Sequence, residues 1–173
     1  MEDIRIIQAN TEDCETLAPL AERMFTATFG HLYRPENLRA HLAQAYSASS
    51  FRACLAAGDT IILMKSGDIL MGYGQVGQVA LPAPPPVPPG AIEIHRVYID
   101  SAHHGKGYGK QLMQHLLSLP HVAQAPILYL GVWEENRRAQ ALYKQFGFTQ
   151  VGRYLYQVVD QFDQELILAR TRS

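Results

Sequence analysis

Hydrophobic residues follow two different periods along the chain, and each change of period marks a predicted element. Apolar residues spaced three or four apart predict amphipathic helices over residues 11–28, 35–46, 107–119 and 136–146. Short apolar runs and alternating positions predict strands over residues 4–7, 60–64, 69–79, 91–99, 127–133, 150–159 and 165–169. Ser47–Ser50 is predicted as a loop, and the last two strands as a hairpin that turns near Asp160–Asp163.

The order of these elements indicates one mixed α/β domain over residues 1–173. A strand is followed by two helices, three strands, a helix, a strand, a helix and two final strands. The proline-rich segment Pro82–Pro89 lies between two of the strands, and proline cannot donate a hydrogen bond within a sheet. We therefore predict a stiff surface loop there; the alternative is a ligand for a proline-recognising domain.

Composition and charge argue against several classes of protein. Apolar residues make up 47% of the 173 residues and charged residues 18%, which is typical of a folded globular chain. Lysine and arginine number 15 against 16 acidic residues, so we do not predict nonspecific nucleic-acid binding, which needs excess positive charge. The chain starts without a basic and apolar leader and has no apolar window of about 20 residues, so we predict a cytoplasmic protein that binds no membrane. Cys14 and Cys54 are isolated, in agreement with a reducing compartment.

A glycine-rich loop between a strand and a helix carries the first chemical signal. Gly105, Gly107 and Gly109 follow the predicted strand 91–99 and begin the helix 107–119. Glycines allow a ligand to approach the backbone closely, and the free N–H groups of a helix start attract phosphate. The spacing fits neither the P-loop pattern nor the dinucleotide pattern GxGxxG. A phosphate or pyrophosphate site is predicted; the alternative is a glycine-rich turn that binds nothing.

Two motifs together resemble the GNAT family of N-acetyltransferases. The loop sequence His104-Gly-Lys-Gly-Tyr-Gly is similar to the family's acyl-CoA loop, (Gln/Arg)-x-x-Gly-x-(Gly/Ala), with His104 in the place of glutamine or arginine. The second motif is a strand, an asparagine at a helix start, a tyrosine seven residues later and Gly-Phe, here Asn136, Tyr143, Gly147 and Phe148. The resemblance implies a single-domain fold with a central, mostly antiparallel mixed sheet of about seven strands flanked by about four helices.

The resemblance also implies acetyl-CoA as co-substrate and assigns residues to it. The backbone of Val97, Tyr98 and Ile99 would pair with the pantetheine arm. Asn136 would contact the arm, and Tyr143 would protonate the departing thiolate; the alternative for Tyr143 is a core aromatic. The pyrophosphate would lie in the loop formed by His104, Gly105, Lys106, Gly107, Tyr108, Gly109 and Lys110.

The general base is predicted on the strand that precedes the glycine loop. Some relatives carry a glutamate on the strand of the second motif, where this chain has Gly131. Glu93 and His95 are two residues apart and are expected on one face of their strand, with Arg96 on the other. We favour Glu93 as the base, with His95 as the second candidate; the alternative is a structural pair of side chains.

The acceptor side is predicted around the first helices and the end of the cofactor strand. Phe29, His31, Tyr33 and Trp133 are candidate substrate-binding residues, although a helix-packing role would suit them equally. The resemblance extends to bacterial acetyltransferases of polyamines and small amines. It implies direct acetyl transfer to the primary amine of a small molecule. The alternatives are a non-catalytic CoA-binding sensor or partner module, and an acetyltransferase of protein N-termini or lysines. No metal site is predicted, and a homodimer is expected only from the general tendency of small enzymes.

Overall fold

A single twisted sheet organises the computed structural model, which describes residues 3–173. The strands lie in the order β1-β2-β3-β4-β5-β7-β6, and every neighbouring pair is antiparallel except β4–β5. This is the mixed, mostly antiparallel seven-stranded sheet that the sequence predicts. The strands are β1 (Ile4–Gln8), β2 (Thr60–Ser66), β3 (Ile69–Gln78), β4 (Ile92–Ile99), β5 (Ile127–Trp133), β6 (Thr149–Val158) and β7 (Gln161–Thr171).

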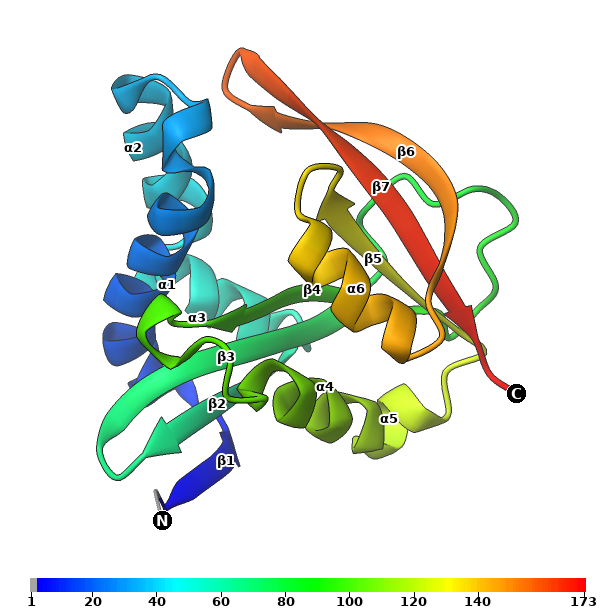
Figure 1. Cartoon of the computed structure of the whole chain (residues 1–173), viewed down its shortest axis with the longest axis horizontal. Helices are drawn as coiled ribbons and strands as arrows, with labels where there is room; N and C mark the ends of the chain where they lie inside the picture. Colours follow the sequence, from blue (N-terminus) through cyan, green and yellow to red (C-terminus); the bar gives the residue numbers. More distant parts are fainter. Residues whose placement is uncertain (1–2) are drawn as a thin grey trace.

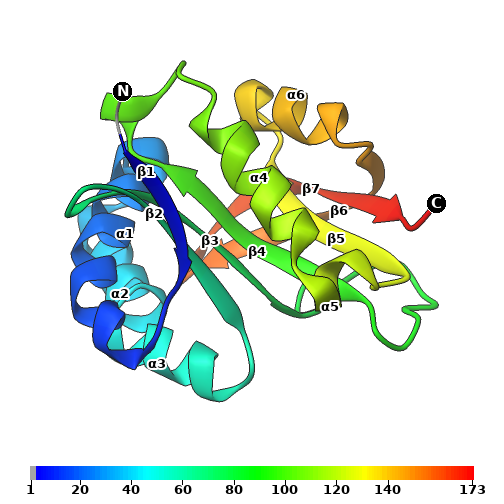
Figure 2. The same cartoon turned by 90° about the horizontal axis from the view of Figure 1, so that it is seen from below.

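Helices cover both faces of this sheet. The first three helices lie against one face and the last three against the other, as the two views in Figure 1 and Figure 2 show. The helices are α1 (Cys14–Phe29), α2 (Pro35–Ala45), α3 (Ala48–Ala56), α4 (Tyr108–Ser118), α5 (Pro120–Ala123) and α6 (Arg137–Gln145). Short 3-10 turns η1 (Thr11–Asp13), η2 (Gly30–Leu32) and η3 (Ser101–His103) join several of them.

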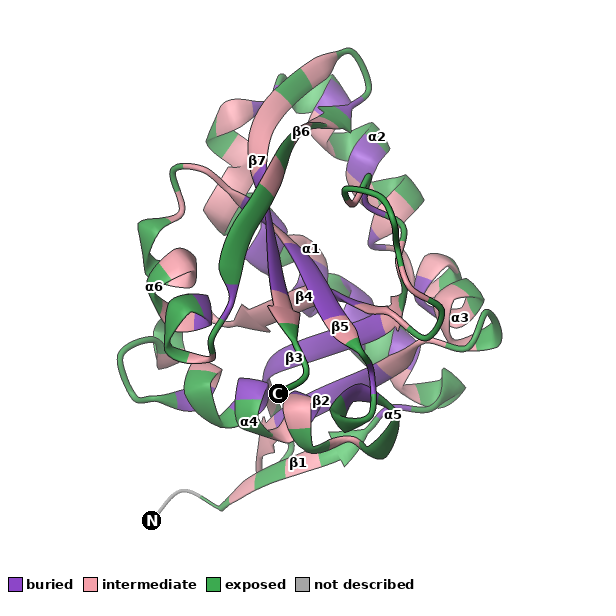
Figure 3. Ribbon diagram, turned by 90° about the vertical axis from the view of Figure 1, so that its right-hand side faces the viewer, coloured by how far each residue is buried: buried purple, intermediate pink, exposed green. Residues whose placement is uncertain are grey.

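Two hydrophobic cores fill the space between the sheet and its helices. One core packs Leu112 and Leu116 of α4 against Ile94 of β4 and the neighbouring strands. The other packs Leu17 of α1 and Phe51 of α3 against the opposite face. Figure 3 shows the buried residues concentrated on the central strands, with exposed positions along α2, α6 and β6. The site therefore lies on a scaffold that is held rigid from both sides.

The segment predicted as a loop at Ser47–Ser50 is the start of a helix, so this prediction is wrong. Ser47 is the N-cap of α3, and its hydroxyl oxygen accepts a hydrogen bond from the Ser50 N–H at 3.2 Å. A serine-rich sequence is common both in loops and at helix starts. The deciding contact is tertiary, because Phe51 of this short helix is fully buried in the core. The four-residue helix α5 was also not predicted.

The hairpin β6–β7 turns earlier than predicted. Strand β7 begins at Gln161, which pairs with Val158, and the turn itself consists of Val159 and Asp160. The polar sequence 161–164 resembles a turn, but its residues continue the ladder to β6. As a result Asp163 lies inside a strand, two residues from Glu165, so both side chains lie on the same face of β7.

Strands β4 and β5 pair only at their beginnings. The parallel ladder joins Ile92 to Leu128 and Glu93 to Tyr129, and beyond these pairs the two strands diverge. Residues 94–99 of β4 therefore have no strand neighbour on that side, and half of their backbone N–H and C=O groups face an open wedge. The wedge lies between the halves of the sheet and opens a passage from one face to the other.

A β-bulge in β4 changes which side chains share a face. Ile94 pairs with Val76 and Arg96 pairs with Gln75, so His95 is the extra residue. The alternation predicted for this strand therefore fails at His95. Arg96 was expected on the face opposite to Glu93, but its guanidinium lies 4.2 Å from the ring centre of Tyr46, on the α1–α3 side. That expectation is corrected by the bulge.

The proline-rich segment forms an irregular loop, as predicted. It carries no helix or strand, and it packs beside Gly152 through Pro84. Its start is held by Glu93, whose Oε2 accepts hydrogen bonds from the N–H groups of Ala80 at 2.7 Å and Leu81 at 2.9 Å. Within residues 3–173, no helix has the length and apolar character that crossing a bilayer requires.

Candidate active site

A cleft of about 830 Å³ follows the wedge between β4 and β5. It runs from the glycine loop before α4, past β4 and α6, to the hairpin β6–β7 and the first helices. Its walls include Tyr143, which belongs to the core under α4 and α6, and Phe25, which belongs to the core under α1–α3. The wall of the cleft is therefore built from residues of both cores, which lie on opposite faces of the sheet.

The glycine loop has the backbone that its sequence predicts. Gly105 and Gly107 have φ angles of +79° and +81°, which L side chains rarely adopt. Gly107 is also the N-cap of α4, so the loop leads directly into the positive end of that helix. His104 fixes the loop to the strand, because its Nε2–H donates a hydrogen bond of 2.7 Å to the Ile99 carbonyl.

This loop fits the pyrophosphate of a coenzyme A molecule. No heavy atom lies within 4 Å of a Cβ built on Gly105 or Gly107, so the surface above both residues is open. The first turn of α4 directs backbone N–H groups toward the same space. Of the predicted loop residues, all border the cleft except Lys106: His104, Gly105, Gly107, Tyr108, Gly109 and Lys110.

Asn136 is the N-cap of helix α6, and Tyr143 lies within this helix. The Asn136 side chain caps α6 by accepting a hydrogen bond of 3.2 Å from the Ala139 N–H, and both Asn136 and Tyr143 border the cleft. Tyr143 is 8% exposed, and its ring packs against Phe148. Burial raises the pKa of Tyr143, and the nearby Glu165 carboxylate raises it further. The phenol thus keeps its proton at neutral pH.

Glu93 and His95 form a contact, as their spacing predicts. The His95 Nδ1 lies 3.2 Å from Glu93 Oε1, and its Nε2 lies 3.9 Å from Asp59 Oδ2. Burial by itself would raise the pKa of Glu93, but hydrogen bonds from His95 and from the amides of Ala80 and Leu81 outweigh it and lower the pKa. Glu93 is therefore a strongly hydrogen-bonded carboxylate that also holds the proline-rich loop.

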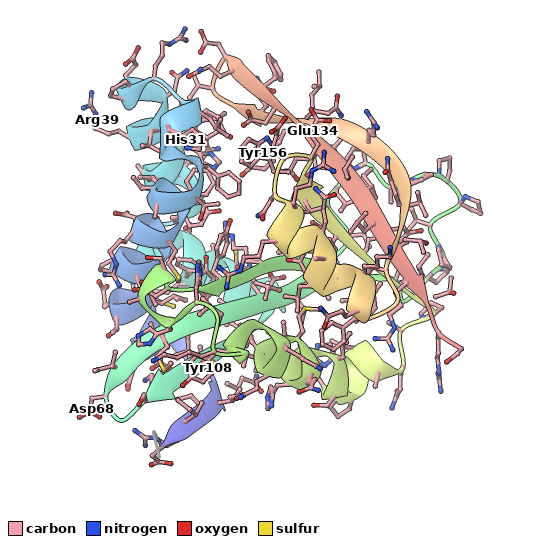
Figure 4. All side chains as sticks on the ribbon, viewed as in Figure 1. His31, Arg39, Asp68, Tyr108, Glu134 and Tyr156 are labelled. Atoms are coloured by element: carbon pink, nitrogen blue, oxygen red, sulfur yellow. The ribbon has the colours of Figure 1, made fainter. Side chains whose placement is uncertain are left out.

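Three of the four predicted acceptor residues border the cleft. They are Phe29, Tyr33 and Trp133, and the rings of Phe29 and Trp133 meet at a centroid distance of 5.9 Å. His31 packs against Trp133 at 6.1 Å and does not border the cleft. Figure 4 shows Tyr156 in the space between the first helices and β5–β7, with Tyr108 at the start of α4.

The hairpin β6–β7 contributes polar residues that the sequence analysis missed. Tyr154, Tyr156, Asp163 and Glu165 all border the cleft. The Tyr154 hydroxyl donates a hydrogen bond of 2.8 Å to Glu165 Oε2. Burial raises the pKa of Glu165 from 4.5 to about 7, against the opposing effect of this hydrogen bond. The sequence signal for these residues is the spacing of Asp163 and Glu165, two positions apart as on one face of a strand. It was missed because residues 160–163 were predicted as a turn.

Gly131 makes room for the Glu165–Tyr154 pair. A Cβ at this position would lie 2.6 Å from the Tyr154 hydroxyl oxygen and 2.7 Å from Glu165 Oε2, which is closer than real Cβ atoms come. Any larger residue would displace the pair. Some relatives are expected to carry a glutamate at the position of Gly131. In this chain Gly131 lies directly beside a carboxylate of another strand, Glu165 of β7.

A network of hydrogen bonds joins the turn between α1 and α2 to the tip of the hairpin β6–β7. We call it the hairpin bridge. The Tyr33 hydroxyl donates to Asp163, and Asn37 Nδ2 donates to Asp160 Oδ1 at 2.7 Å. Arg34 forms an ion pair with Asp160, and its backbone N–H donates to Gln161 Oε1 at 2.8 Å. Of the residues of the bridge, Tyr33 and Asp163 also border the cleft.

The residues 3–173 contain no group of three or more His, Cys, Asp or Glu side chains arranged to hold a metal ion.

Comparison with known proteins agrees with this geometry. The sequence profile of the Acetyltransferase (GNAT) family matches residues 19–148. An uncharacterized N-acetyltransferase in the pepI 3' region of Lactobacillus delbrueckii subsp. lactis is 24% identical over 171 residues, 98% of both chains. The N-alpha-acetyltransferase RimI of Mycobacterium tuberculosis is 34% identical over 88 residues, 51% of both chains. The spermine/spermidine N(1)-acetyltransferase of Bacillus subtilis is 35% identical over 60 residues, 34% of this chain and 40% of the relative.

A solved structure extends the likeness to the whole fold. The PaiA N-acetyltransferase from Thermoplasma acidophilum, solved in complex with coenzyme A, superposes with a TM-score of 0.77 at 18% identity and covers 98% of this chain and 99% of its own. The diverging strands, the glycine loop and the family profile thus lead to one assignment. The chain belongs to the GNAT family of N-acetyltransferases.

Proposed function

We propose that the protein transfers the acetyl group of acetyl-CoA to a primary amine of a small molecule. Coenzyme A would enter from the α4–α6 face, with its pyrophosphate on the loop 104–110 and its pantetheine arm along Val97, Tyr98 and Ile99. When bound, acetyl-CoA supplies the acetyl thioester. Tyr143 then donates its proton to the departing sulfur, and Asn136 helps to hold the cofactor arm.

The hairpin bridge is the observation that favours a small molecule over a protein as the acceptor. It connects Tyr33 and Asn37 to Asp163 and Asp160 across the acceptor side of the cleft. A protein acceptor needs an open groove between these elements, whereas a small molecule fits an enclosed space. The N-alpha-acetyltransferase among the relatives keeps a protein N-terminus as the second candidate acceptor.

The charge of the cleft supports a cationic acceptor. Asp59, Glu93, Asp163 and Glu165 border it, and they outnumber Arg96, the buried cation on the same face as Glu93. The other cations of the wall, Lys110 and Arg138, lie in the glycine loop and on α6, at the proposed cofactor end. Aromatic rings of Phe29, Tyr33 and Trp133 are suited to contact the carbon chain or the charge of an alkylammonium. An amine that arrives protonated therefore meets complementary charge.

The homodimer and the cytoplasmic location stay predictions.

The test is release of CoA from acetyl-CoA, followed by a thiol reagent, against a panel of amines. The panel contains spermidine, spermine, amino acids, aminoglycosides, and peptides with a free N-terminus or a free lysine. Rapid release with one small amine and slow release with peptides is the expected result. Faster release with peptides would transfer the assignment to a protein acceptor. Tight acetyl-CoA binding by calorimetry without release on any acceptor would favour a non-catalytic CoA-binding module.

A further inference from the structure

We propose that Glu165 is the general base of the reaction, and that Gly131 is required because it leaves the space in which the Glu165 carboxyl group lies. The inference rests on acetyl transfer to an amine as proposed above. It replaces Glu93, the base predicted from the sequence, by a residue from a different strand.

Among the four carboxylates that border the cleft, hydrogen bonds argue against Glu93, and the close approach to Gly131 of β5 sets Glu165 apart from Asp59 and Asp163. Both oxygens of Glu93 have partners, from His95 and from two backbone amides. Asp163 accepts from Tyr33 and Asp59 accepts from Gln75, each through Oδ2 alone, so their hydrogen bonds do not exclude them; neither contacts Gly131 as Glu165 does. The single side-chain partner of Glu165 within residues 3–173 is Tyr154, which occupies Oε2. Oε1 is the oxygen left for an acceptor amine or a water molecule.

The position of Glu165 relative to Tyr143 suits an acid–base pair. Tyr143 belongs to the core on the α4–α6 face, while Glu165 contacts Tyr154 on the opposite face of the sheet. The wedge beyond the last β4–β5 pair opens between these two faces. A thioester in the wedge would thus have Tyr143 on its sulfur side and Glu165 on the side from which the amine attacks.

The proton transfers then balance. As the bond between the amine nitrogen and the acetyl carbon forms, Glu165 accepts a proton from that nitrogen. The carbon–sulfur bond breaks, and Tyr143 donates its proton to sulfur. An acceptor that arrives as an ammonium first gives one proton to the Glu165 carboxylate, which releases it to solvent before the amine attacks. After the attack, proton exchange through solvent returns the second proton from Glu165 to Tyr143, so that an ammonium and an acetyl thioester yield an amide, a thiol and one proton in solution.

The environment of Glu165 supports this role. Burial raises its pKa to about 7, so a base and its conjugate acid are both accessible near neutral pH. The carboxylates of Asp163 on β7 and Glu93 on β4 raise its pKa further, whereas the hydrogen bond from Tyr154 on β6 lowers it. Glu165 in turn raises the pKa of the phenols of Tyr156 on β6, Tyr143 on α6 and Tyr33 after η2. Glu93, by contrast, has a lowered pKa, which makes it a weaker proton acceptor.

The main experiment measures turnover against pH for the wild type and three variants, with spermidine and with a peptide α-amine. Glu165→Gln should reduce kcat by about 10²-fold or more. It should also abolish the rise of kcat through about pH 7, while the Kd of acetyl-CoA stays unchanged. The loss should be larger for spermidine, because an α-amine with a pKa of about 8 loses its proton more easily than an alkylamine. Glu93→Gln should keep the pH midpoint, and so should the control Glu134→Gln, which alters a carboxylate outside the cleft wall.

A pair of glycine variants tests the space at Gly131. Gly131→Ala should lower turnover, because its Cβ must displace both Glu165 and Tyr154. Gly152→Ala is the matched control in strand β6, on the other side of β7, since its Cβ would make only ordinary contacts of 3.5 Å or more. Both proteins should bind acetyl-CoA as the wild type does. Equal turnover of the two variants would contradict the role of Gly131.

A measurement without turnover separates this inference from the proposed function. NMR of protein with ¹³C-labelled glutamate carboxyl groups should show one group that titrates near pH 7 and is missing in Glu165→Gln. The assignment of Glu165 as the base would be overturned if kcat of Glu165→Gln still rises through about pH 7 and stays within about threefold of the wild-type value. The absence of a carboxyl group that titrates near pH 7 would also overturn it, whether or not any amine in the panel is acetylated. Inactivity on all amines would by itself overturn only the proposed function.

Discussion

At the scale of single residues, the cleft holds titratable groups whose pKa values are shifted in different directions by their surroundings. Burial keeps the phenol of Tyr143 protonated, hydrogen bonds keep Glu93 ionised, and burial brings the pKa of Glu165 to about 7. These differences arise from neighbours that are distant in the sequence. They underlie the proposed roles of Tyr143 as proton donor, Glu93 as a structural carboxylate and Glu165 as proton acceptor.

Replacing Tyr143 by phenylalanine tests the proton donor. Tyr143→Phe should lower kcat by about 10²-fold, because the departing thiolate loses its acid. The ring and its contact with Phe148 are retained, so the Kd of acetyl-CoA should stay within a factor of about two, a difference of about 0.4 kcal/mol. Steady-state kinetics and calorimetry check the two quantities. An unchanged kcat would show that another group protonates the sulfur.

The stability of the fold should depend on pH through Glu165. Its pKa is about 7 in the folded protein and its ordinary value is 4.5, so the folded state binds the proton more tightly. The stabilisation is fully present below about pH 4.5, falls as the pH rises, and is lost above about pH 7. A difference on the order of 3 kcal/mol in unfolding free energy is expected across this range. Urea unfolding of wild type and Glu165→Gln at pH 4.5, 6 and 8 measures it; parallel curves would contradict the raised pKa.

At the scale of elements, irregular segments position the site. The bulge at His95 turns Arg96 toward Tyr46, and the divergence of β4 from β5 creates the wedge. The glycine loop then joins the end of β4 to the positive end of α4. Regular strands and helices provide the rigid support, while each departure from regularity exposes backbone or side chains to the cleft.

Glu93 is expected to act on stability through the proline-rich loop. Glu93→Gln removes one of its two acceptor oxygens and replaces it with an NH₂ donor. The amides of Ala80 and Leu81 both donate to Oε2, and His95 lies beside Oε1, so the cost depends on which oxygen is replaced. We expect a loss of about 1–3 kcal/mol in unfolding free energy. Chemical denaturation measures it, and proteolysis near residues 80–90 reports whether the loop is released; a variant as stable as wild type would contradict this anchoring role.

Opening the hairpin bridge should affect the acceptor more than acetyl-CoA. Asp160→Ala removes the partner of Arg34 and Asn37 at the tip of the hairpin. The KM for the small amine should rise several-fold, whereas the KM for acetyl-CoA should stay the same. Asp68→Ala, at the exposed β2–β3 turn, is the control. Equal KM values for the amine in the two variants would argue against the bridge as a wall of the acceptor site.

At the scale of the whole molecule, the cleft connects two cores that otherwise meet only across the sheet. The α4–α6 core borders the proposed cofactor side and the α1–α3 core borders the acceptor side. A ligand in the wedge would contact both β4 and β5 where they have no ladder between them. Binding should therefore stabilise the folded chain as a unit.

Acetyl-CoA is expected to raise the thermal stability. At a free concentration 100 times its Kd, a ligand that binds only the folded state adds about 2.7 kcal/mol. A chain of this size should then unfold at a Tm higher by about 6–10 °C. Gly107→Ala should reduce the shift at the same ligand concentration, because its φ of +81° disfavours a side chain and the loop must move. Differential scanning calorimetry measures it, and an equal shift in both proteins would show that the loop does not hold the ligand.

The sequence by itself predicted the seven strands of the sheet, the helices α1, α2, α4 and α6, and the two segments that are proposed to hold the cofactor. Helical and alternating periods identify local structure, and the residues from His104 to Lys110 and from Asn136 to Tyr143 are continuous segments whose geometry is largely local. Only the tertiary structure decided the acceptor side. Glu165, Gly131 and Tyr154 come from three strands, and their contact depends on the register of β7 between β5 and β6. A pairing register and the burial of a charge are properties of several segments at once, so no single segment of the sequence contains them.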